Sequence, residues 1–124
     1  MPYSDAFKNV MLNAGVRGVA PDTDGINKVS AHDGAPGSTG ANEISGGSYA
    51  RQAITWNAAS AGSIDDSNAP AIPIPGGKTV SYIGFWYDSG GANEIFAGYV
   101  DVADEAFTND GTYTVTDADL DLNA

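Results

Sequence analysis

The chain has 124 residues and no cysteine, with 16 acidic side chains against five basic ones and a formal net charge of −11 at pH 7. This length suits one domain that buries a core without disulfides or a structural metal. The lack of cysteine excludes a disulfide framework, a thiol nucleophile and a cysteine-ligated metal site. Its apolar runs are too short to cross a bilayer, and its first residues do not follow a secretory signal pattern, so we expect a soluble protein without membrane insertion.

The charge is unevenly distributed along the chain. Residues 79–124 carry nine acidic side chains and no basic one, whereas residues 1–78 carry seven acidic and five basic ones. Such a field repels phosphate, which argues against nucleic acid as a partner. Solvent-facing acids that keep the protein soluble explain this pattern. The alternative is an acidic patch that docks on a basic partner or collects divalent cations.

Residues 3–14 are predicted to form a short helix. Ser4 is a suitable N-cap and Gly15 can close the helix. Because so short a helix is marginal alone, its apolar stripe must pack on its own domain or on a neighbouring subunit. The stripe consists of residues at helical spacing: Ala6, Phe7, Val10, Met11 and Ala14.

From residue 25 onward the sequence predicts β-structure. Runs typical of strands, bounded by Gly, Pro, Asn, Asp and Ser, occupy residues 26–33, 50–56, 69–75, 79–87, 94–102 and 112–122. The prolines of 69–75 predict an edge position, and the apolar residues on both faces of 79–87 predict a central strand or one covered by another chain. A loop is expected at 34–48 and a hairpin turn at 88–93. The pattern predicts an all-β fold, a single β-sandwich domain over 1–124 with a short N-terminal helix.

Groups that could carry catalysis are sparse. The one histidine, His32, lies in a predicted strand, and no G-x-S-x-G elbow occurs in the sequence. We interpret His32 as an ordinary strand histidine. Carboxylate pairs such as Asp65 and Asp66 lie in predicted turns, which do not meet a glycosidase's need for a cleft and a raised pKa. We therefore predict no enzymatic activity and no cofactor.

Asp22 and Asp24 are the best candidates for metal ligands, because they supply closely spaced oxygens just before Gly25. The pattern of an EF-hand is incomplete, since a further ligand before the glycine and a downstream glutamate at the right spacing are missing. The sequence leaves open a weak structural calcium site, with an Asx turn as the alternative.

Aromatic side chains could stack on a carbohydrate wherever they are exposed. Alternation along the predicted strands favours core positions for Trp56 and Trp86. Tyr49, next to Gly and Ser in a loop, is the aromatic residue expected outside. Together with Asn42 and Glu43 it forms the candidate ligand-facing surface.

Four segments, taken in order, resemble a known family. They are YSDAFKNVMLNAG (3–15), VSAHDGAPGSTGANEISGGSYARQAITWNAASAG (29–62), VSYIGFWYDSGG (80–91) and GTYTVTDADLDLN (111–123). Their order is similar to that in small minor tail or tail-fibre-type proteins of tailed bacteriophages, especially those that infect actinobacteria. The resemblance implies a virion structural protein with a β-sandwich fold and no catalytic residues, made in the host cytoplasm and carried on the particle.

The leading prediction is thus a non-enzymatic minor tail or tail-fibre component near the adsorption apparatus. A capsid decoration protein on the head surface and a glycan-binding host-attachment module are the alternatives. The expected partners are other virion proteins, a homo-oligomer or multiple copies in the particle, and, for the last alternative, a host surface glycan. Candidate contact residues are the apolar Phe7 and Met11 and the cations Lys8, Arg17 and Arg51. Solvation or an internal ion pair is the alternative for the cations.

Overall fold

The computed structural model describes residues 3–18, 25–88, 94–116 and 119–121. Within these residues the chain forms one helix and eight strands, and every strand pair is antiparallel. The elements are α1 (Asp5–Gly15), β1 (Ile26–His32), β2 (Gln52–Ala53), β3 (Ser63–Asp65), β4 (Ala71–Ile74), β5 (Lys78–Asp88), β6 (Glu94–Phe107), β7 (Gly111–Thr114) and β8 (Asp119–Asp121). The all-β class with a short N-terminal helix is confirmed.

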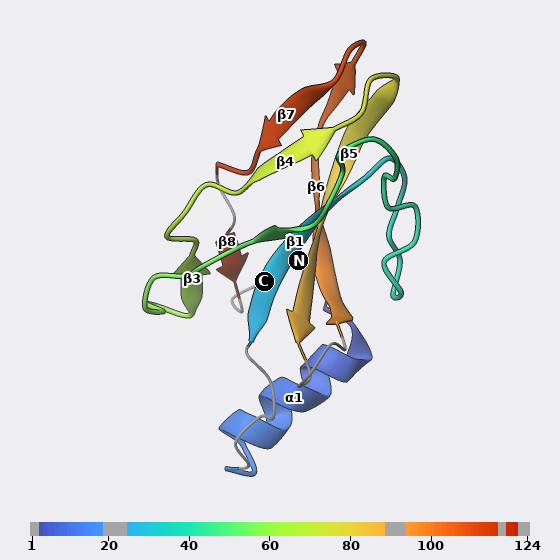
Figure 1. Cartoon of the computed structure of the whole chain (residues 1–124). Helices are drawn as coiled ribbons and strands as arrows, with labels where there is room; N and C mark the ends of the chain where they lie inside the picture. Colours follow the sequence, from blue (N-terminus) through green and yellow to red (C-terminus); the bar gives the residue numbers. More distant parts are fainter. Residues whose placement is uncertain (1–2, 19–24, 89–93, 117–118, 122–124) are drawn as a thin grey trace.

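The main sheet has four strands in the order β2-β1-β5-β6. Its long strands β5 and β6 run the length of the molecule beside β1 (Figure 1). β5 lies between β1 and β6, as its apolar residues on both faces predict. The register of β5 against β6 shifts between Phe85 and Trp86 and again between Val80 and Tyr82. Such bulges increase the local twist of the pair.

Two short ribbons accompany the main sheet, β4 with β7 and β3 with β8. The sequence predicts one strand over 112–122, but the structure divides this run. After Thr114 the chain leaves β4, with the Val115 amide bonded to the Pro70 carbonyl at 2.8 Å, and it then pairs with β3 as β8. Within the described residues the two ribbons are therefore separate two-stranded sheets instead of one continuous sheet.

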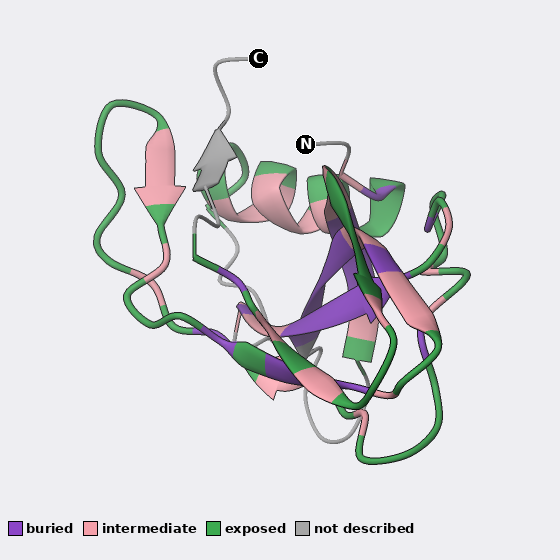
Figure 2. Cartoon of the chain, turned by 90° about the horizontal axis from the view of Figure 1, so that it is seen from above, coloured by how far each residue is buried: buried purple, intermediate pink, exposed green. Residues whose placement is uncertain are grey.

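The core lies between one face of the main sheet and the β4–β7 ribbon. Val29 and Phe85 on the sheet are fully buried, as is Ile72 on β4, and the purple segments of Figure 2 converge there. Pro73 lies on β4 between two buried isoleucines and pairs with Thr112 of β7. β4 tolerates this proline because, among the described strands, it has a partner on one side only.

Other boundaries differ from the sequence-based expectation. The strand predicted over 50–56 shrinks to β2. Beyond it, the Ile54 amide still donates to the Asn27 carbonyl of β1 at 3.1 Å, and Trp56 pairs only as an isolated bridge with Asp66. Residues 63–65 form β3 where a turn was expected at Asp65, and β6 continues to Phe107. The predicted turn at residues 89–93 and the candidate metal ligands Asp22 and Asp24 lie outside the described residues.

Helix α1 crosses one end of the main sheet (Figure 1). The Ser4 amide donates to the Ala97 carbonyl at 2.7 Å, and the Ser4 hydroxyl accepts from the Phe7 amide at 3.2 Å, so one residue both caps the helix and fixes it to β6. No helix in the described part of the chain is long and apolar enough to span a membrane.

Candidate interaction surfaces

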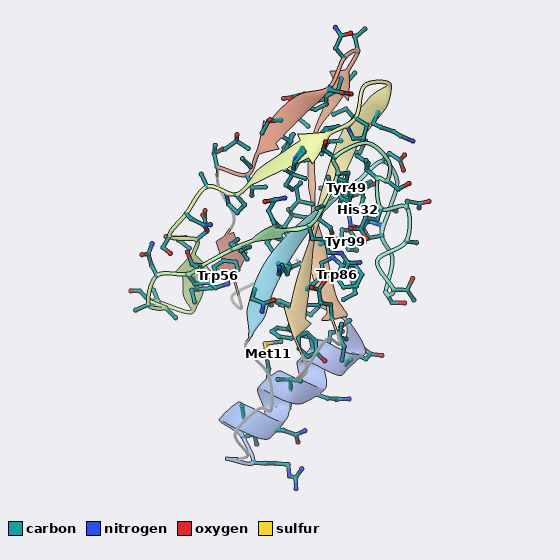
Figure 3. The ribbon with its side chains drawn as sticks, in the orientation of Figure 1. Met11, His32, Tyr49, Trp56, Trp86 and Tyr99 are labelled. Carbon is teal, nitrogen blue, oxygen red and sulfur yellow. The ribbon has the colours of Figure 1, made fainter. Side chains whose placement is uncertain are left out.

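An apolar groove runs beside helix α1, and we call it the helix groove. Phe7 and Met11, one helical turn apart, form its helix side, and Ile64 of β3 lies opposite. The groove has a volume of about 220 Å³ and almost no polar lining. The structure thus brings together the two apolar residues predicted to contact a partner. Figure 3 shows Met11 at this end of the molecule.

Phe7 also has a structural role. Its ring lies 5.2 Å from that of Tyr87 in the core and 5.7 Å from that of Tyr3, measured between centroids. Phe7 is therefore shared between core packing and the groove, whereas Met11 is not part of the core cluster.

Two further apolar side chains of this end are exposed. Leu12 is 57% and Val16 78% accessible, and no residue of α1 is fully buried. Helical spacing predicts the Phe7–Met11 stripe, but Leu12 and Val16 fall outside that stripe and were not singled out. Leu12 and Val16 do not line the helix groove, but they add exposed apolar surface on and just after α1.

The predicted cations separate into two groups. Lys8 lies 3.5 Å from Asp5 on the exposed side of α1, and the Arg17 guanidinium donates to the Asn13 side chain at 3.0 Å. Both remain exposed, Lys8 on α1 and Arg17 just after it. Arg51, in contrast, lies in another part of the molecule and is engaged within the chain.

Arg51 joins three segments of the chain. Its Nε and Nη2 donate to the Glu43 carboxylate at 3.0 and 2.8 Å, and its Nη1 donates to Glu94 at the start of β6. The guanidinium also stacks 3.5 Å above the Trp86 ring. The internal ion pair, one of the two alternatives for this cation, is therefore what the structure shows.

Tyr49 and Glu43 are committed to the same network. The Tyr49 hydroxyl donates to Glu43 at 2.7 Å and accepts from the Ala31 amide at 3.0 Å. Tyr49 is thus half-buried, which corrects the expectation of an exposed aromatic residue. Its hydroxyl provides the acceptor for the Ala31 amide at the edge of β1.

The pKa values reflect this network. Burial raises the pKa of Tyr49. Burial alone would also raise the pKa of Glu43, but hydrogen bonds from Arg51 and Tyr49 outweigh it and hold this pKa below its ordinary value. Glu43 is consequently a stable anion in the fold, paired to the guanidinium. Of the candidate ligand-facing residues, only Asn42 is exposed, and its side-chain amide donates to the Ala35 carbonyl at 3.0 Å.

A second network lies on the same face of the main sheet, beneath residues 34–44. His32 is fully buried, with Nε2 2.7 Å from the Ser30 hydroxyl and Nδ1 2.8 Å from the Ala41 carbonyl. The Trp86 indole donates to the same Ser30 hydroxyl at 2.8 Å. His32 is a strand histidine as predicted, and its polar partners are Ser30 of the same strand and the Ala41 carbonyl of a loop.

Sequence reasoning missed Ser30, Trp86 and Glu94 as partners of these networks. Arg51 and Glu94 are 43 positions apart, and Ser30 and Trp86 are 56 apart. No local pattern links such positions; only the β1–β5 and β5–β6 registers bring them together. Within the described ranges no group of three or more His, Asp or Glu side chains could hold a metal ion.

These features define a small all-β domain with an apolar groove beside its helix and a surface loop that is held by internal ion pairs. The model of the family described as podophage GP4 fiber I protein gp80 matches residues 2–123, and the chain belongs to this family. A search of curated proteins found no match.

Family membership makes the chain a phage tail fibre protein, a structural component of the virion that associates with other virion proteins. The predicted resemblance to tail-fibre-type proteins is confirmed at this level. Its link to actinobacteriophages stays a prediction.

Proposed function

We propose that the chain is a non-enzymatic fibre component near the adsorption apparatus, attached to a neighbouring virion protein through the helix groove. The observation that carries this proposal is the apolar surface at α1, where Met11 lines the groove and Leu12 and Val16 are exposed. Exposed apolar side chains concentrated on one element are typical of a protein contact site. The family supplies the setting, since a fibre protein must be held by other virion proteins.

The test replaces Met11 and Leu12 together by serine. We expect the variant to fold normally yet to be missing from purified particles, as measured by circular dichroism and by immunoblot. Phe7 is left unchanged, because its contact with Tyr87 would mix attachment with stability. Asn9→Ser, an exposed change on the same helix, is the matched control and should be incorporated like the native chain. Normal incorporation of the double variant would refute attachment through the groove.

The position on the particle is tested separately by immunogold labelling of intact virions. Gold at the tail end supports a fibre or minor tail position near the adsorption apparatus. Gold spread over the heads would favour the alternative of a capsid decoration protein.

Glycan binding is a second candidate function, for which the structure offers a different surface from the loop residues first considered. Tyr82 and Tyr99 are half-exposed, with ring centroids 5.7 Å apart in an edge arrangement. Tyr99 is further supported by Phe96 at 6.5 Å. Aromatic rings held in this way can stack on a sugar. Tyr99→Ala should abolish retention on host cells if this function holds, and unchanged retention would speak against it.

The proposal has four further parts. The chain forms one β-sandwich domain over residues 1–124, is present in multiple copies, is made in the host cytoplasm, and belongs to a phage with an actinobacterial host. We propose multiple copies because avidity then compensates for the small contact area of each copy. Quantitative mass spectrometry of purified virions gives the copy number, and sedimentation of the isolated chain gives its oligomeric state.

A further inference from the structure

The network around His32 is complete only when the imidazole is neutral. Nδ1 faces the Ala41 carbonyl and must carry a hydrogen to donate to it. The Trp86 indole donates to the Ser30 hydroxyl, which in turn donates its own hydrogen to Nε2. A protonated Nε2 would instead donate to Ser30 and would leave the hydroxyl hydrogen without an acceptor among the described residues. Adding a proton to His32 therefore disrupts a buried hydrogen-bond chain.

His32 is also the point where residues 33–44 are fastened to the edge of β1. The Asp33 amide donates to the Asn42 carbonyl at 3.1 Å, and the Ile44 amide donates to the Ala31 carbonyl at 2.9 Å. His32 and Glu43 form an antiparallel bridge between these two bonds. We call residues 33–44 the strap, because the segment returns along β1 beyond the short strand β2.

The underside of the strap packs on the aromatic face of the sheet. A Cβ on Gly40 would lie 2.7 Å from the Trp86 ring, so no side chain fits between the strap and the indole at this position. Gly40 has φ +80°, a conformation that suits glycine. The strap, His32 and Trp86 thus form one tightly fitted unit.

Charged groups near His32 act in both directions. Burial lowers the pKa of His32 most strongly; Glu43 on the strap and Asp33 beside it raise this pKa, and Arg51 lowers it. The residues that β5 and β6 place against the imidazole, Gly84 and Phe96, are uncharged. The net result is a pKa below the ordinary value of 6.5.

We propose that protonation of His32 releases the strap from the edge of β1 as the pH falls below neutrality, so that residues 33–44 form an acid-sensitive element. Because the released state binds the proton more tightly, the stabilising contribution is fully present above about pH 6.5 and is lost as the pH falls from there through the pKa of the folded state. Glu43, whose pKa lies below 4.5, stays ionised while this happens. The acid response just below pH 6.5 therefore belongs to His32. This inference does not depend on attachment through the helix groove.

The test is native-state hydrogen exchange of the full chain at about pH 7.5 and about pH 5, corrected for intrinsic exchange rates. We expect the amides of Asp33 and Ile44 to lose protection at the lower pH, whereas the amide of Val115 keeps its protection. The Val115 amide bonds to Pro70 on the far ribbon and serves as the internal reference. Equal loss at all three amides would refute release of the strap.

Two further measurements assign the effect to His32. Because the chain has one histidine, its imidazole resonance can be followed by NMR without ambiguity, and release should share its midpoint. His32→Gln keeps a neutral polar side chain and should remove the pH dependence. If this variant does not fold, the native chain alone decides, because titration of the imidazole with no change in strap protection would overturn the proposal. Persistence of the same acid response in a folded His32→Gln variant would also overturn it.

Discussion

At the scale of single residues, Gly84 shows why the side chains on this face of the sheet can be packed in only one way. It lies on β5 opposite Ser30 of β1, and a Cβ there would be 2.5 Å from the Ser30 hydroxyl and 2.6 Å from His32 Nε2. Neither the Ser30 hydroxyl nor His32 Nε2 can move away, because both take part in the buried hydrogen bonds with Trp86 and with each other. A side chain at position 84 would occupy the space that the histidine and serine need.

Gly84→Ala should therefore lower the stability of the fold by about 1–3 kcal/mol, the usual cost of overpacking a core. Thermal unfolding at neutral pH measures this as a fall in Tm. Gly15→Ala is the matched control, since no described atom lies within 4 Å of a Cβ there. The control should gain about 0.4–1 kcal/mol. An unchanged Tm for Gly84→Ala would show that the His32 network is looser than described.

The sequence predicts residue environments well where a local rule applies. Ser4 caps the helix as its type and position indicate, and His32 is a strand residue. Tyr49 was expected to be exposed because its neighbours are glycine and serine. Its burial depends on Glu43 and on a free amide at the edge of β1, and neither partner follows from local sequence.

At the scale of elements, alternation and length predict the long strands and fail for the short ones. β5 follows the predicted run closely, because apolar residues on both faces are a strong signal. β2 and β3 have two and three residues, and such lengths carry no periodicity. The division of 112–122 into β7 and β8 depends on partners far away in the chain, so local alternation continues across the break.

Arg51 fastens the segment that follows the strap. Its side chain is 28% exposed, it makes hydrogen bonds with two carboxylates, and it stacks on Trp86. Lysine can reproduce neither the bidentate bond nor the planar stacking. Arg51→Lys should consequently destabilise the fold by about 1.5–3 kcal/mol, the range for hydrogen bonds to charged groups.

Thermal unfolding of Arg51→Lys beside Arg17→Lys checks this prediction. Arg17 is exposed on the chain after α1 and bonds to Asn13, so its replacement should change stability by less than about 0.5 kcal/mol. Equal effects of the two substitutions would mean that the Arg51 network contributes little. A larger loss of stability in Arg51→Lys would show that the Arg51 hydrogen bonds hold the loop in place, instead of forming a cluster of surface charges with little effect on stability.

At the scale of the whole molecule, the order of four segments indicated a phage tail-fibre-type protein, whereas composition indicated only an acidic domain. The groove beside α1 was foreseen in part, since helical spacing places Phe7 and Met11 on one stripe. Its opposite wall, with Ile64, belongs to a strand that the sequence did not predict. A contact surface built from two elements far apart in the chain becomes visible only once the fold is known.

The net charge of −11 has a consequence for the whole fold. Like charges repel more strongly in the compact state than in the unfolded chain, and salt screens this repulsion. Raising NaCl from about 0.02 M to about 0.5 M shortens the screening length several-fold, so the Tm should rise. The partly buried Arg51–Glu43 pair is screened less than exposed charges, and its loss should not cancel the gain. A falling Tm would show that attractive pairs outweigh the repulsion.

Calcium chloride at matched ionic strength separates screening from binding, because only an occupied calcium site would raise the Tm beyond the value in NaCl.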